Sequence, residues 1–153
     1  MVLILDGKAL STQIKEELKT KLLKYNNKPG LAIILVGNKP DSEIYVRMKK
    51  KACQYVGISN FDYHFDENVN EQIILDKIKE LNNNDNVSGI LVQLPLPKHI
   101  NKRKVIETID HRKDVDGFHP MNVGNLSSGY DSSIPCTPLG CSLLIKQAEK
   151  NLS

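Results

Sequence analysis

Apolar residues recur along the chain with spacings that predict several helices. Through residues 9–25, leucine and isoleucine return every four residues with charged residues between them, which is typical of an amphipathic helix. A second helix is predicted from a cap at Asp41 or Ser42 to a stop at Gly57, and a third follows a cap at Asn70. The positions expected to be buried in these three helices are Leu10, Ile14, Leu18 and Leu22, then Ile44, Met48, Ala52 and Val56, then Ile74, Ile78 and Leu81.

Three segments between and after these helices have the patterns of β-strands. "LAIILVG" (31–37) is a continuous apolar run, as expected of a strand covered on both faces. "FDYHFD" (61–66) alternates aromatic and polar residues like a half-buried strand, and "VSGILVQ" (87–93) predicts a third. Two further helices are expected at 101–110 and 138–151. Because strands alternate with helices, we predict an α/β fold, a three-layer αβα domain with a mainly parallel sheet.

The composition is that of an ordinary soluble domain. With 153 residues, of which 40% are hydrophobic and 25% charged, the chain can form one domain with its own core. It has no apolar run near the length of a membrane span and no signal peptide, so we expect no membrane partner and a cytoplasmic location. Cys53, Cys136 and Cys141 form no CxxC pair and do not cluster with the histidines, which argues against disulfides and a metal site. A net charge of +3 does not require a nucleic-acid partner.

Ligands of parallel sheets bind beyond the carboxyl ends of the strands, and this rule directs attention to three loops. They are "GNKPDSEIY" (37–45), "QLPLP" (93–97) and the long segment 111–138, which shows little regular pattern. Loops of that length in a compact domain usually serve a function. The glycines form neither a G-x-G nor a phosphate-loop pattern, so these residues predict no Rossmann-type dinucleotide site.

Tyr45 and Lys49 are four residues apart and therefore share one face near the start of the second helix. Lys49 could simply belong to a solvated cluster with Arg47, Lys50 and Lys51, and Tyr45 could be a boundary aromatic residue. Alternatively, neighbouring positive charge and partial burial favour the neutral amine of Lys49, which could then act as an acid or a base near neutral pH. The same cations could also contact phosphates.

Gln93 is a polar residue at the end of an otherwise apolar strand. A buried amide must be hydrogen-bonded, and the backbone of a neighbouring loop could satisfy it. The alternative is a functional amide, because Pro95 and Pro97 force the chain out of the sheet just where Gln93 would face a ligand crevice. Asp114 and Asp116 precede Gly117, and this Asp-x-Asp-Gly pattern indicates a turn in the first place. Alternatively, a carboxylate in this loop could hold N–H groups of a ligand.

Taken in order, these stretches resemble the bifunctional methylenetetrahydrofolate dehydrogenase/methenyltetrahydrofolate cyclohydrolase enzymes. The resemblance runs through "ILDGKAL", "LAIILVGNKPDSEIYVRMKKKACQYVGI", "LNNNDNVSGILVQLPLPKHI", "KDVDGFHPMNVGNL" and "IPCTPLGC". It implies an enzyme of one-carbon metabolism that oxidises 5,10-methylenetetrahydrofolate with NADP or NAD. The same enzyme would then hydrolyse the methenyl product to 10-formyltetrahydrofolate.

The resemblance also implies roles for individual residues. Tyr45 is similar to the tyrosine that stacks on the folate, and Lys49 to the catalytic lysine. Gln93 is similar to the glutamine that positions this lysine, and Asp116 to the carboxylate that grips the pterin ring. Two further matches, which line the folate pocket in the family, are Leu94 and Pro95.

The resemblance further implies a division of the chain. Residues 1–120 would form the folate-binding catalytic domain, and residues 121–153 a loop and a helix leading to a C-terminal Rossmann domain. That second domain would bind most of the NADP, so we expect this chain to be a fragment, inactive as a dehydrogenase and weak in folate binding. We expect the full-length enzyme to be a homodimer and the fragment to be mostly monomeric.

Two other classes of function remain open from the residues alone. The chain could be a non-enzymatic pterin or folate carrier that keeps the pocket without turnover. It could also be an interaction domain whose basic helix docks on nucleic acid through Lys50 and Lys51.

Overall fold

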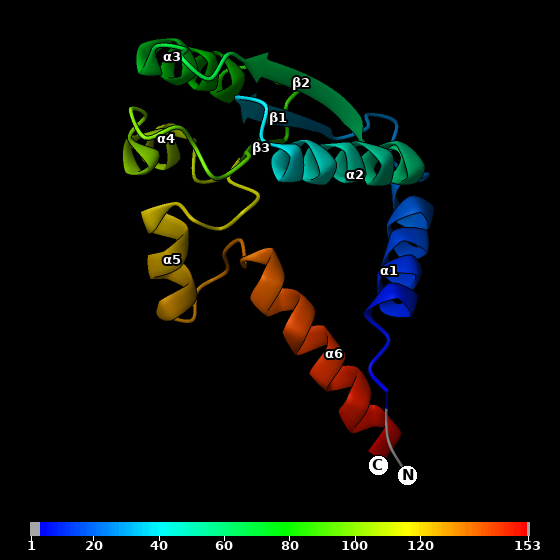
Figure 1. The fold of residues 1–153 in the computed structure, drawn as a ribbon. Coiled ribbons are helices and arrows are strands. Elements are labelled where there is room, and N and C mark those ends of the chain that lie inside the picture. Colours follow the sequence, from blue (N-terminus) through cyan, green and yellow to red (C-terminus); the bar gives the residue numbers. More distant parts are fainter. Residues whose placement is uncertain (1–3, 153) are drawn as a thin grey trace.

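A computed structural model describes residues 4–152 of the protein as a three-stranded sheet with helices on both faces (Figure 1). All strand pairs are parallel, and the strand order is β2-β1-β3. The elements are, in order, α1 Gly7–Leu22, β1 Gly30–Val36, α2 Pro40–Val56, β2 Ser59–Phe65, α3 Glu71–Asn82, β3 Gly89–Val92, α4 Lys102–Thr108, α5 Pro120–Ser127 and α6 Cys136–Leu152. The predicted α/β class and parallel sheet are confirmed.

The central strand β1 separates two apolar layers, which is why its sequence is continuously apolar. Ala32, Ile34 and Val36 belong to a large cluster with buried residues of α3, β3 and α4. Ile33 and Leu35, which point to the other face, pack with Val46 of α2 and Leu91 of β3. The sheet therefore has α3 and α4 on one face and α2 on the other, as the three-layer prediction requires.

Local signals in the sequence located several element ends correctly. Gly57 ends α2 with a φ of 91°, a left-handed backbone that glycine adopts without strain. Asn70 caps α3, because its side chain accepts a hydrogen bond from the backbone N–H of Gln72. The predicted buried positions of α3, Ile74, Ile78 and Leu81, are all buried.

The predicted buried face of α2 is wrong in its first half, although Val56 is buried as predicted. Ile44 and Met48 are 44% and 63% exposed, and the buried residues are Ser42, Val46, Cys53 and Val56. A strict four-residue spacing rotates by about 40° per step around a helix of 3.6 residues per turn, so only the last members of the predicted stripe reach the sheet. The predicted cap is also wrong, because the helix begins at Pro40 with Lys39 as its N-cap.

Two further expectations differ from the structure. None of the described residues of α1 is buried, because this helix lies against α2 beside the domain and not over the sheet (Figure 1). The segment 111–138, expected as a loop with little regular structure, contains α5 and the first residues of α6. Helix α5 has only eight residues, and its N-cap is His119, whose ring accepts a hydrogen bond from the N–H of Met121. The sequence pattern did not predict this helix because it is short and lacks one of the usual capping residues. Within residues 4–152, no helix has the length and apolar character needed to cross a membrane.

The different burial of Ile78 in α3 and Ile44 in α2 gives a testable expectation. Ile78→Ala in α3, where the side chain is 0% exposed, should lower the free energy of unfolding by about 2–5 kcal/mol because it leaves a cavity. Ile44→Ala in α2 should cost under about 1 kcal/mol because nearly half of the Ile44 surface is exposed to solvent. Urea unfolding of the two variants measures both values, and equal losses would contradict the observed orientation of α2.

Candidate active site at the carboxyl ends of the strands

Gln93 lies immediately beyond the carboxyl end of β3. Its backbone N–H donates to the carbonyl of Ile34 at 2.8 Å, which fixes the residue next to the central strand. The strand ends at Val92, so the chain leaves the sheet before Pro95 and Pro97, as the prolines predicted. The side chain of Gln93 is therefore delivered to the edge of the sheet where ligands of parallel folds bind.

Lys49 reaches the same place from α2. Its Nζ donates a hydrogen bond of 2.8 Å to Oε1 of Gln93. The Nε2 group of Gln93 donates to the carbonyl of Leu94, also at 2.8 Å, and this second bond orients the amide so that its oxygen faces the lysine. Tyr45 lies one turn earlier on α2, with its ring centroid 5.7 Å from Nζ of Lys49. At 60% exposure, the Tyr45 ring is open to a planar ligand.

Asp114 and Asp116 have different tasks. The buried Asp114 makes the turn, because its Oδ1 accepts hydrogen bonds from the backbone N–H groups of Asp116 and Gly117, both at 3.1 Å. Gly117 is required at this turn, since its φ is 68° and a Cβ would lie 2.6 Å from the carbonyl oxygen of Ser133. The carboxylate of Asp116 takes no part in this turn and is left for other partners.

The environment of Asp116 perturbs its acidity. Burial raises the pKa of the Asp116 carboxyl above its usual range, because the charged form loses water. The positive charge of Lys49 acts in the opposite direction, and the negative charge of Asp114 raises the pKa further. A half-buried carboxylate with a raised pKa beside a lysine is the kind of group that active sites hold.

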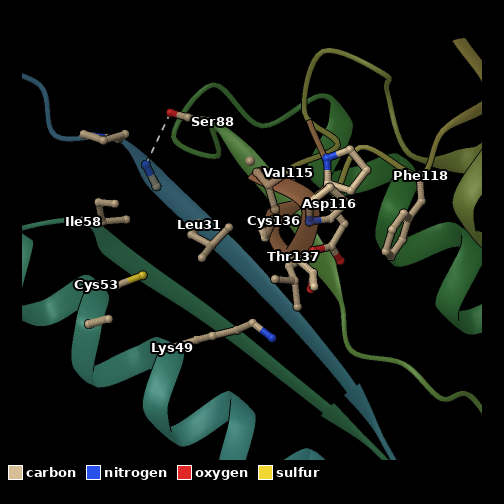
Figure 2. A pocket seen from close by; sticks show the side chains of 17 residues that line it. Leu31, Lys49, Cys53, Ile58, Ser88, Val115, Asp116, Phe118, Cys136 and Thr137 are labelled. Carbon is tan, nitrogen blue, oxygen red and sulfur yellow. Dashed lines mark hydrogen bonds between the residues drawn. The ribbon is translucent and has the colours of Figure 1, made fainter. Parts of the chain in front are cut away.

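Lys49 and Asp116 both line a cavity of about 810 Å³ that runs along the α2 face of the sheet. Figure 2 shows Lys49 extending from α2 across this cavity toward the side on which Asp116 and Thr137 lie. Much of the wall is apolar and comes from the strands and the segment between α4 and α5, including Leu31, Leu91 and Val115. The volume and the few polar groups suit a small aromatic or heterocyclic ligand.

The structure brings most, but not all, of the predicted site residues together. Gln93 and Tyr45 contact Lys49, and Asp116 lines the large cavity with Lys49. Leu94 lies instead on a second, much smaller cavity of about 10 Å³, which Asp116 also lines. Pro95 is exposed and lies on neither cavity. The large cavity also has residues that the sequence patterns did not indicate, namely Phe118, Pro135, Cys136 and Thr137. They come from the segment expected to be loop, and only the aromatic residue directly after the Asp-Gly turn could have been a signal.

The described residues at this edge of the sheet combine groups that can exchange protons with a ligand. Within residues 4–152, no three His, Cys, Asp or Glu side chains are grouped so that they could hold a metal ion. An amine held by an amide, next to a carboxylate with a raised pKa, can bind N–H groups of a ligand and move protons. The exposed tyrosine face adds a stacking surface.

Comparison with known proteins places this geometry in a family. The model of the family described as "Tetrahydrofolate dehydrogenase/cyclohydrolase, catalytic domain" matches residues 5–116. The bifunctional protein FolD of Pelagibacter ubique is 56% identical over 156 residues, which cover 99% of this chain and 56% of that protein. The protein of the same name from Aquifex aeolicus is 54% identical, and the match covers 52% of its length.

Solved structures agree with this match. The bifunctional enzyme FolD, a methylenetetrahydrofolate dehydrogenase/cyclohydrolase from Campylobacter jejuni, has a TM-score of 0.93 and 51% identity, covering 96% of this chain and 54% of that one. The corresponding enzyme of Trypanosoma brucei, solved with NADP and an inhibitor, has a TM-score of 0.91 and 34% identity over 97% of this chain and 52% of that one. The chain thus spans about half the length of these relatives. With more than half of its residues matched by the catalytic-domain model, the chain belongs to the tetrahydrofolate dehydrogenase/cyclohydrolase family.

Proposed function

We propose that this chain is the folate-binding catalytic part of an enzyme of one-carbon metabolism. That enzyme would oxidise 5,10-methylenetetrahydrofolate to the 5,10-methenyl form and hydrolyse the latter to 10-formyltetrahydrofolate. The observation that carries the proposal is the Lys49–Gln93 hydrogen bond of 2.8 Å at the edge of the sheet where Asp116 also lies. The relatives' names, which combine dehydrogenase and cyclohydrolase, support it.

In this proposal each side chain has a role that its geometry permits. The carboxylate of Asp116 accepts hydrogen bonds from N–H groups of the pterin ring, and the exposed ring of Tyr45 stacks on the folate. Gln93 holds the amine of Lys49 in place through its oriented amide oxygen. Two residues of the following loop, Leu94 and Pro95, would complete the folate pocket when the substrate is bound.

The hydrolysis needs a proton removed from the attacking water and a proton delivered to N5, and in this proposal Lys49 makes both transfers. Water adds to the cationic methenyl carbon of the substrate, a new C–O bond forms, and the amine of Lys49 accepts the proton that the water loses. The bond from that carbon to N5 then breaks, and the ammonium of Lys49 returns the proton to N5. The hydroxyl on the former methenyl carbon loses its proton to the solvent as the C=O bond of the formyl group forms, so the product is 10-formyltetrahydrofolate, one proton is released overall, and Lys49 returns to its starting form.

NADP is proposed as the cofactor of the whole enzyme, and the described residues do not by themselves fit a dinucleotide site. The connection from β1 to α2 has no glycine-rich turn, and Pro40 at the start of α2 lacks the N–H that a phosphate would need there. NADP would be held mainly by the half of the relatives that this chain does not span. NADP would supply a hydride acceptor to the whole enzyme, and the residues described here would hold the folate.

Two other functions find less support. Nucleic-acid docking by α2 would need a free basic face, but Lys50 forms an ion pair with Asp62 at 2.9 Å and Lys49 is bonded to Gln93. A folate carrier without catalysis would not need an amine held beside a carboxylate with a raised pKa. A cytoplasmic location and a homodimeric full-length enzyme remain proposals from the sequence.

Calorimetry on the 153-residue chain tests the proposal. We expect measurable but weak binding of tetrahydrofolate and none of NADP, because the chain holds the folate site and lacks a dinucleotide loop. Tight NADP binding by this chain alone, or no binding of tetrahydrofolate, would contradict the proposal.

A further inference from the structure

Among the described residues of this site, Asp114 has the most deeply buried carboxylate, with an exposed fraction of 3%. Its Oδ1 accepts from the N–H groups of Asp116 and Gly117. Its Oδ2 accepts from the N–H of His119 at 2.8 Å and from Nδ2 of Asn122 at 2.9 Å. Four donors thus replace the water that the buried charge has lost.

Asn122, in α5, is equally buried and connects this carboxylate to three segments of the chain. Its Nδ2 donates to the carbonyl of His111 at 2.8 Å as well as to Asp114. Ser132 donates its hydroxyl to the carbonyl oxygen of Asn122 at 2.9 Å, with the amide oxygen at 3.3 Å. The helix that the sequence pattern did not predict therefore holds the loop on which Asp116 lies.

The same loop is tied to the sheet at its other end. The N–H of Ile90 in β3 donates to the carbonyl of Lys113 at 2.7 Å, and Ile90 and Asp114 form a parallel β-bridge. Between these anchors, the carboxylate of Asp116 makes no hydrogen bond of its own in the described part of the chain. The direction of this carboxylate therefore depends on the backbone that Asp114 holds.

We propose that Asp114 and Asn122 are positioning residues that aim the carboxylate of Asp116 at the substrate. This inference rests on the proposed function, because it assigns Asp116 to the folate. The charge of Asp114 adds a second effect, since it raises the pKa of Asp116 and so opposes its ionised form. A fixed backbone lets a half-buried carboxylate meet a ligand without first losing conformational freedom.

The test is a double-mutant cycle on tetrahydrofolate binding by the 153-residue chain. Asn122→Ala removes the donors to Asp114 and His111 and should weaken binding about tenfold, the effect of one lost hydrogen bond on a fixed group. In a chain that already carries Asp116→Ala, the same change should have no further effect on affinity. The matched control is Asn125→Ala, on the same helix, whose side chain forms no hydrogen bond in the described structure and whose loss should change affinity less than twofold or so.

A purely structural role gives a different result. If Asn122→Ala weakens binding equally with and without the Asp116 carboxylate, or not at all, the positioning role is overturned. Should Asn122→Ala fail to fold, Ser132→Ala removes only the hydroxyl that holds Asn122, and it should weaken binding by about threefold with the same dependence on Asp116. Unchanged affinity in that variant would equally overturn the proposal.

A second readout separates this inference from the proposed function. If the unchanged chain does not bind tetrahydrofolate, the proposed function fails, but the positioning can still be judged by NMR. Asn122→Ala should then speed hydrogen exchange at the amides of Asp116 and Gly117 and shift the carboxyl resonance of Asp116, while Asn125→Ala should not. If neither signal changes, the network does not hold Asp116.

Discussion

Lys49→Met is expected to lower the rate of 5,10-methenyltetrahydrofolate hydrolysis by about 10²- to 10⁴-fold, the usual contribution of a positioned acid or base. Methionine keeps much of the length and the apolar stem of lysine but can neither accept nor donate a proton. The measurement is made in a chimera in which residues 1–153 replace the matching half of the Campylobacter jejuni enzyme, which has the same fold over 96% of this chain.

A matched control comes from the same helix. Lys51→Met changes an exposed lysine two residues further along α2, on a different face from Lys49, and should leave the hydrolysis rate within about twofold of the unchanged chimera. Neither change should lower the thermal midpoint by much, because neither side chain belongs to the buried core. A Lys49→Met chimera that hydrolyses the substrate at the unchanged rate would remove Lys49 from the mechanism.

Asp116→Asn should have opposite effects on binding and on stability. The affinity for tetrahydrofolate should fall by about 10- to 100-fold, because the amide replaces a charged acceptor of N–H groups with a neutral one. The free energy of unfolding at pH 7 should rise, because the folded protein no longer has to bury a charge at this position. Urea unfolding and calorimetry on the same two proteins measure both quantities.

The sign of the stability effect follows from the raised pKa of Asp116. A carboxyl whose folded pKa is higher than its unfolded pKa binds its proton more tightly in the folded state. Its contribution to stability is therefore fully present below the unfolded pKa and is lost as the pH rises through the folded pKa. The advantage of Asp116→Asn should accordingly shrink as the pH is lowered toward 4 or so, and an advantage that grows in acid would contradict the raised pKa.

Those parts of the fold that depend on strong local signals were predictable from the sequence. The continuous apolar run of β1 predicts a strand covered on both faces, and the structure confirms it. Gln93 could be located because an amide followed by alternate prolines marks the point where a strand must leave the sheet. The hydrogen bond between Lys49 and Gln93 was not readable from spacing, since 44 residues separate the two; the family resemblance supplied it.

Other parts were not predictable because long-range packing decides them. The face of α2 is set by Val46, which packs on residues of the sheet, while the apolar residues Ile44 and Met48 are exposed. The separate tasks of Asp114 and Asp116 depend on the donors of α5, a helix whose short pattern resembles a loop. From sequence patterns alone, it therefore stayed open whether these two carboxylates form a turn or bind a ligand.

The central claim is that the folate binds between Lys49 and Asp116 at the carboxyl ends of the strands. It is tested most directly by titrating the isotope-labelled 153-residue chain with tetrahydrofolate and following the amide resonances by NMR, a method that detects weak binding. We predict that the largest shifts occur at Tyr45, Lys49, Gln93 and Asp116. Shifts confined to α1 and α6, or none at saturating ligand, would contradict the account.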